Sequence, residues 1–246
     1  MKNVPPQLAD FLTLHIWQEA IKLLDFQVNQ KKRNKHYNTL SMYYYEKLGM
    51  SVSTINAEEY FNEKVANNLF YVLEDEFNIS TYLMPKPGLG LRNYKFLSYP
   101  MRSLYYAVGL YIFRLSWQFL EDVRADKKNI KSYYGASLSL NKDDLVISSN
   151  TTYFQKPYKA FRKQMRKELD GDTDNNVVIR LDIKDFYDEI SIPNLFELLF
   201  NNIKPSVKHE MNFGPATIEQ LKFFFRFLSD GKPGILQYDN DINQCC

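Results

Sequence analysis

Large apolar residues near the start of the chain recur at helical spacing. Between positions 11 and 24 they fall three or four residues apart, at Phe11, Leu14, Trp17, Ile21 and Leu24. This spacing places them on one face of an amphipathic helix. A second pattern of this kind covers residues 57–74. We therefore expect the first eighty residues to be mainly helical, with the basic, Asn-rich stretch at 31–38 forming a surface loop.

Proline and glycine then punctuate the chain at residues 84–93, where ten residues hold two of each. Such a composition predicts a tight connection or a hairpin. An apolar stripe resumes over residues 103–119 and predicts a helix that packs into a core. Two short β-like segments follow at 133–138 and 145–148, and the polar residues between them predict a turn.

A strongly basic helix is predicted from Pro157 onward. Proline suits the first turn of a helix because the N–H that it lacks has no partner there. The apolar residues of this segment are Tyr158, Phe161, Met165 and Leu169, and its cations are Lys156, Lys159, Arg162, Lys163, Arg166 and Lys167. We expect the apolar side to pack and the other side to be strongly positive. A positive side either neutralises nucleic-acid phosphates or is simply solvated, and the spacing leaves both readings open.

A short apolar segment rich in β-branched residues, 177–183, predicts a strand with an acid near its end. Nucleotidyl transfer by two metal ions needs carboxylates held on a strand end, so that Mg²⁺ can bridge the attacking oxygen and the phosphates. Asp182 and the backbone carbonyl of Ile183 are therefore candidate metal ligands. Asp185 is a candidate neighbour of the triphosphate, and the ring of Tyr187 a candidate contact for the nucleotide sugar.

The acids after this strand also have a structural interpretation. Asp185, Asp188 and Glu189 are close in sequence. Negative charges at such positions favour the N-terminus of a following helix. Two further helical patterns, over residues 193–200 and 217–228, come later in the chain.

The composition narrows the class of protein. Hydrophobic residues make up 45% of the 246 positions, which is enough for a core. A net charge of +2 does not by itself indicate a nucleic-acid partner. The only cysteines, Cys245 and Cys246, are adjacent, which excludes a disulfide framework or a cysteine-based zinc site and suits a reducing cytoplasm. We see no apolar run of about twenty residues, so we expect a soluble protein with no membrane partner.

Four segments together resemble reverse transcriptases, particularly the bacterial group II intron, retron and abortive-infection kinds. The run Asp182-Ile183-Lys184-Asp185-Phe186-Tyr187 resembles their first catalytic motif. Lys86 to Arg92, followed by Pro100, is similar to the fingers segment in which a Lys and an Arg grip the triphosphate. Ser132 to Gly135 resembles the next fingers motif. Gly234 to Gln237 resembles the loop that lies along the nascent base pair.

The resemblance implies an α+β fold with reverse-transcriptase-like fingers, a partial palm and a helical N-terminal region. The expected division is a helical region at 1–80, fingers at 81–170 and a partial palm at 171–246. The implied activity is that of an RNA-directed DNA polymerase using Mg²⁺, nucleoside triphosphates and an RNA template or single-stranded nucleic acid, in the setting of antiphage defence. Asp182 would be the catalytic metal ligand, and the nucleotide would be bound by Lys86, Arg92, Asp185, Phe186, Tyr187 and Gln237.

The chain departs from the family pattern near its end. Leu236 stands where the family usually has proline, and Tyr238 where glycine commonly follows. Reverse transcriptases then carry an aromatic-x-Asp-Asp hairpin, whereas the only Asp doublet here, Asp143-Asp144, precedes Asp182 in a polar turn. We therefore expect this chain alone to be inactive. The alternative is a catalytically inactive module that binds nucleic acid or a partner chain.

Overall fold

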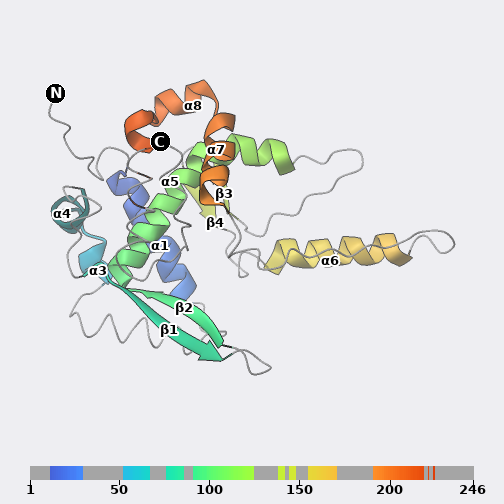
Figure 1. Cartoon of the computed structure of the whole chain (residues 1–246), viewed down its shortest axis with the longest axis horizontal. Coiled ribbons are helices and arrows are strands. Elements are labelled where there is room, and N and C mark those ends of the chain that lie inside the picture. Colours follow the sequence, from blue (N-terminus) through green and yellow to red (C-terminus); the bar gives the residue numbers. More distant parts are fainter. Residues whose placement is uncertain are drawn as a thin grey trace. The chain divides into compact units, whose positions relative to one another are not determined.

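The computed structural model describes a chain built mainly from helices (Figure 1). It describes residues 12–29, 52–66, 76–85, 91–124, 138–141, 144–147, 155–170 and 191–218, together with Leu221 and Phe224. The helices of this part are α1 (Leu14–Asn29), α3 (Val52–Ile55), α4 (Glu58–Tyr60), the π-helical turn η2 (Phe61–Ala66), α5 (Tyr99–Arg124), α6 (Gln155–Asp170), α7 (Ile192–Asn202) and α8 (Pro205–Glu210). The strands are β1 (Ile79–Pro85), β2 (Leu91–Leu97), β3 (Leu138–Asn141) and β4 (Asp144–Ile147).

The expected α+β fold is wrong for the part of the chain that the structure describes. The described strands form two separate two-stranded antiparallel hairpins, β1 with β2 and β3 with β4, and no layered sheet is found among the described residues. A two-stranded ribbon offers too little area to organise a core. The described core instead comes largely from α1 and α5, whose long apolar stripes bury large side chains. The predicted strand at 177–183 lies outside the described residues.

The chain divides into two compact units. The first consists of Met1–Leu115 with Ile192–Cys246, and the second of Ser116–Ser191. The helix α5 begins in the first unit and ends in the second.

The core of the first unit centres on Trp17 of α1, which is fully buried. Its indole N–H donates a hydrogen bond to the carbonyl of Ile55, at 2.9 Å. Its ring also stacks with that of Tyr60, with centroids 6.3 Å apart. Packing and the hydrogen bond therefore hold the α3–α4 segment against α1, and the polar N–H is not left unsatisfied in the core.

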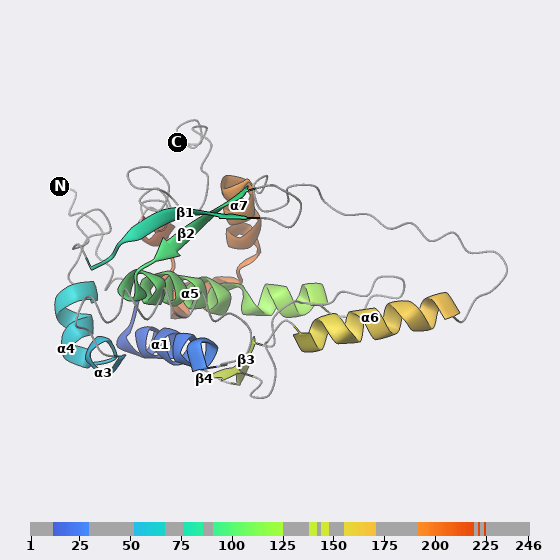
Figure 2. The same cartoon turned by 90° about the horizontal axis from the view of Figure 1, so that it is seen from below.

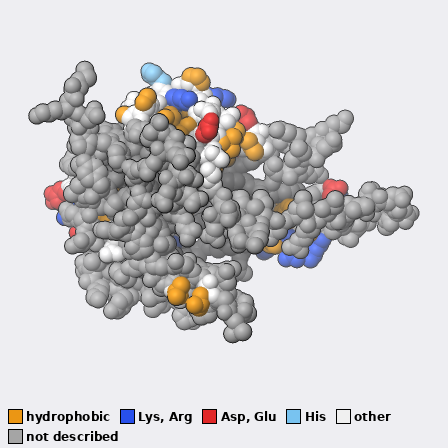
Figure 3. All heavy atoms as spheres, viewed as in Figure 1, with side chains coloured by type: hydrophobic (Ala, Val, Ile, Leu, Met, Phe, Trp, Pro, Cys, Tyr) orange, Lys and Arg blue, Asp and Glu red, His pale blue; other side chains and the backbone are white. Residues whose placement is uncertain are grey.

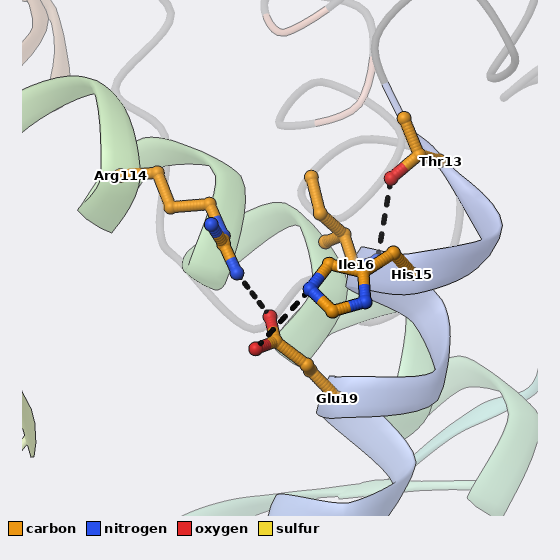
Figure 4. Close-up of polar contacts among 5 residues, drawn as sticks. All are labelled: Thr13, His15, Ile16, Glu19 and Arg114. Atoms are coloured by element: carbon orange, nitrogen blue, oxygen red, sulfur yellow. Dashed lines mark hydrogen bonds and ion pairs between the residues drawn. The ribbon is translucent and has the colours of Figure 1, made fainter. Parts of the chain in front are cut away.

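The helices α1 and α5 lie side by side in both views (Figures 1 and 2). The guanidinium of Arg114 in α5 pairs with the carboxylate of Glu19 in α1, with an N–O distance of 2.5 Å (Figure 4). The side chains of both residues are nearly buried, at 11% and 12% exposure. His15, one turn before Glu19, lies 3.6 Å from the other carboxylate oxygen. The pair therefore links the two helices through nearly buried side chains of opposite charge.

Both helices begin with side-chain caps. Thr13 Oγ1 accepts a hydrogen bond from the N–H of Ile16, which satisfies one of the free donors at the start of α1 (Figure 4). Ser98, buried before α5, accepts from the N–H of Met101 at 3.3 Å and from the N–H of Asn78 at 3.0 Å. The cap of α5 therefore also ties the entry of strand β1 to the exit of strand β2.

The last described segment of the first unit packs on α5. The hydroxyl of the buried Tyr111 lies 3.5 Å from the carbonyl of Met211, which follows α8. Burial raises the pKa of Tyr111, and a hydrogen bond with Thr217 opposes this rise in part. Next to Met211, Asn212 turns the chain in the left-handed region, with φ of 49°, which Asn tolerates better than most residues.

In the second unit, β3 and β4 pair over four residues each, from Leu138 with Ile147 to Asn141 with Asp144. Asn141 and Asp144, which belong to the polar segment expected to form a turn, are thus the last pair of this short ladder. Within the described residues, no helix is both long enough and apolar enough to cross a membrane.

Candidate nucleic-acid interface

The helix α6 carries the most strongly charged surface predicted from the sequence. It runs from Gln155 to Asp170, so that Pro157 falls in its first turn as expected. At about 3.6 residues per turn, its side chains form three parallel stripes. The first stripe is Tyr158, Phe161 and Met165; the second is Arg162, Arg166, Lys159, Lys163 and Lys167; the third is Ala160, Gln164 and Glu168.

The cations of the second stripe are all exposed. Figure 3 shows Lys and Arg side chains gathered at the right of the view, over α6. Along the helix they recur at every turn, a rise of about 5.4 Å. Lys156 also belongs to α6, but its side chain lies outside the described residues. From Tyr158 to Lys167 the sequence contains no acid, so no carboxylate of this segment offsets the positive charge of the stripe.

The first stripe corrects the expectation that the apolar side of α6 packs. Tyr158, Phe161 and Met165 remain 55%, 41% and 44% exposed. Helical periodicity shows that these residues share a face, but the covering of that face depends on neighbouring elements that periodicity does not encode. The rings were therefore missed as candidate binding residues. Their alternation with cations was the signal that could have indicated them.

Contacts along the helix hold the rings and cations together. The guanidinium carbon of Arg162 lies 5.9 Å from the centre of the Tyr158 ring, within the range of a cation–π interaction. The rings of Tyr158 and Phe161 are 6.4 Å apart. In the third stripe, the side-chain amide of Gln164 donates a hydrogen bond to the carboxylate of Glu168. Arg162 thus lies at the border between the aromatic stripe and the cationic one.

A second group of predicted site residues belongs to the β1–β2 hairpin. The register pairs Met84 with Arg92 and Pro85 with Leu91. Pro85 immediately precedes Lys86 in the sequence, so the backbone places Arg92 at the end of the hairpin where the chain continues into Lys86. Lys86 itself and the side chain of Arg92 lie outside the described residues.

The remaining predicted residues have no described placement. Asp182, Ile183, Asp185, Phe186, Tyr187 and Gln237 all lie outside the described residues. The predicted Mg²⁺ site is among them. Within the described ranges, no three residues of the His, Cys, Asp or Glu types come together in a way that could hold a metal ion.

Comparison with protein-family models, with curated proteins and with solved structures gives no match for this chain.

Proposed function

We propose that this chain binds nucleic acid as the substrate-holding part of an RNA-directed DNA polymerase of the reverse-transcriptase kind. The observation that carries the nucleic-acid part is α6, whose five described cations are all exposed on one helix. Binding of phosphates by exposed cations is favourable because it releases the counterions condensed on the nucleic acid. The proposed setting is the reducing cytoplasm, and the proposed biological role is antiphage defence.

The polymerase part of the proposal is supported by the ordered motifs of the sequence. Lys86 and Arg92 would grip the triphosphate, and the pairing of Pro85 with Leu91 is compatible with a joint action of these two cations. Asp182 and the carbonyl of Ile183 would hold Mg²⁺, which supplies charge stabilisation for nucleotidyl transfer. Asp185, Phe186, Tyr187 and Gln237 would surround the nucleotide.

The nucleic-acid part is tested with two variants that lose the same charge. Lys163→Gln with Arg166→Gln removes two cations of α6, and Lys22→Gln with Lys204→Gln removes two exposed cations of the first unit. We expect only the α6 variant to bind a single-stranded oligonucleotide more weakly. Its plot of log affinity against log salt should also flatten by about 1.4, since each lost phosphate contact on a single strand contributes about 0.7. Equal behaviour of the two variants would contradict the proposal.

The polymerase part is tested by binding of a nucleoside triphosphate with Mg²⁺. Arg92→Gln should weaken this binding about tenfold, because hydrogen bonds to charged groups contribute about 1.5–3 kcal/mol. Lys95→Gln is the matched control, since Lys95 is a second cation of β2 that pairs with Thr81, farther along the hairpin. Asp182→Asn should remove the dependence on Mg²⁺ while the protein stays folded. Nucleotide binding that none of these changes affects would reject the polymerase role.

The second candidate function is a nucleic-acid-binding module without chemistry. The same exposed cations of α6 favour it, because they need no catalytic residues to bind phosphates. Salt-sensitive binding of oligonucleotides by a chain that binds no nucleoside triphosphate would select this function over the polymerase.

A further inference from the structure

The aromatic stripe of α6 has a feature that charge neutralisation does not require. Phosphate binding needs only cations. Beside the cations of α6, however, Tyr158 and Phe161 keep about half of their surface exposed to solvent. Tyr158 is the more exposed of the two, at 55%. An exposed ring next to a row of cations is the combination that single-stranded nucleic acids use, with bases on the rings and backbone on the charges.

The arrangement of the stripes sets the geometry of such a contact. Arg162 lies between the rings and the other cations, with its guanidinium carbon 5.9 Å from the centre of Tyr158. A strand running along α6 would therefore meet rings on one side and cations on the other. Arg162 can contribute to both, because a guanidinium pairs with phosphate and also stacks on flat rings.

Only an unpaired strand can use both stripes at once. In a duplex the faces of the bases are covered by their stacked neighbours, so a ring on the protein surface reaches only groove edges and backbone. In a single strand each base has a face available for stacking. We propose that Tyr158 and Phe161 stack on unpaired bases and make α6 selective for single-stranded over double-stranded nucleic acid. This inference rests on the proposed nucleic-acid binding and extends it.

A membrane surface is the other occupant that a basic amphipathic helix can take. Two observations favour nucleic acid. The exposed apolar stripe is short, with three described residues, and one of them is the polar-tipped Tyr158. The guanidinium of Arg162 lies over that ring, so burying the ring in lipid would carry a charge with it.

The experiment offers the whole chain three oligonucleotides with the same number of phosphates: a single strand, a duplex, and an abasic single strand that has sugars and phosphates but no bases. We expect the single strand to bind about tenfold more tightly than the abasic strand, because only the single strand has bases that can stack on the rings. The duplex should resemble the abasic strand. Equal affinities of the single strand and the abasic strand would overturn the stacking proposal.

The variants separate rings from charges. Tyr158→Leu with Phe161→Leu keeps apolar bulk and removes the flat faces, so the affinity for the single strand should fall about tenfold with an unchanged salt slope. Tyr158→Trp should preserve the affinity. Tyr106→Leu is the matched control, because Arg102 lies over the Tyr106 ring at the same 5.9 Å, and it should leave binding unchanged. An effect of Tyr106→Leu as large as that of the α6 variant would count against the assignment.

Two outcomes distinguish this inference from the function on which it rests. Absence of salt-sensitive binding to any of the oligonucleotides would remove the proposed nucleic-acid binding itself. Salt-sensitive binding without preference among them would retain that function and refute base stacking. The last arm of the experiment offers vesicles containing phosphatidylserine. If the chain binds these vesicles and no oligonucleotide, and the ring variant loses the vesicle binding, α6 would be assigned to a membrane.

Discussion

The helices α5 and α6 have similar apolar periodicity in the sequence and opposite surroundings in the structure. In α5, Met101, Leu104 and Val108 are buried almost completely. In α6, Tyr158 and Met165 remain about half exposed. An apolar stripe therefore predicts that a segment is helical, and it does not predict whether the stripe serves the core or a binding surface.

Polar residues sharpen the same contrast. Ser98 and Ser103 of the α5 region are buried, and the hydroxyl of Ser103 donates to the carbonyl of Tyr99 at 2.9 Å. Arg114 is nearly buried and paired with Glu19. The described cations of α6 are instead exposed to solvent. The charge of Arg114 is thus held inside the protein, whereas the described cations of α6 face solvent.

The largest expected difference comes from making the same substitution in both helices. Met101→Ala in α5 removes a fully buried side chain and should lower the free energy of unfolding by about 3 kcal/mol, through lost burial and a cavity. Met165→Ala in α6, where the side chain is 44% exposed, should change it by less than about 0.5 kcal/mol. Urea unfolding measures both. Similar losses for the two variants would show that α6 is part of a core after all.

A smaller difference is expected for arginine. Arg114→Met leaves the carboxylate of Glu19 nearly buried without its closest cation, which should cost about 2 kcal/mol of stability. Arg166→Met in α6 should leave stability nearly unchanged and weaken binding to nucleic acid. Adding Glu19→Met to Arg114→Met should recover part of the loss, because removing both charges also removes the desolvation penalty. No recovery in the double variant would contradict this account of the pair.

Sequence patterns were reliable for the helices that carry the core. The spacing of Trp17 and Ile21 predicted α1, and the stripe at 103–119 predicted α5, although the structure begins α5 earlier at Tyr99. The missed turn arises from Pro100, since proline often marks a break but is well accommodated in a first helical turn. The Pro- and Gly-rich segment at 84–93 correctly predicted a hairpin, which is now seen to join two seven-residue strands.

Tertiary features were beyond the reach of these patterns. Ser98, the cap of α5, also accepts a hydrogen bond from the N–H of Asn78, which is twenty positions away in the sequence. The pairing of Glu19 with Arg114 joins residues 95 positions apart. The fold class failed for a related reason: motifs describe short segments, and resemblance of Asp182 and its neighbours to a family does not establish the architecture around them. Roles for Asp182 and Tyr187 stay predictions.

The smallest expected effect concerns the hydroxyl of Tyr111 in α5 and how it responds to pH. Burial raises its pKa above the ordinary tyrosine value of about 10. Between the ordinary pKa, which holds in the unfolded state, and the higher pKa of the folded state, the folded state binds more protons than the unfolded state. The stability that this group contributes is therefore complete below pH of about 10 and falls as pH rises further. The slope from this one group is at most about 1.4 kcal/mol per pH unit.

Tyr111→Phe should flatten the fall in unfolding free energy above pH of about 10. At neutral pH the same variant should change stability by less than about 1 kcal/mol, because the hydrogen bond to Met211 is long, at 3.5 Å, and Thr217 keeps its hydrogen bond to the carbonyl of Asn212. Tyr158→Phe in α6 is the matched control and should leave the alkaline slope as in the unsubstituted chain. Parallel alkaline curves for the Tyr111 variant and the unsubstituted chain would show that this hydroxyl is not protected by the fold.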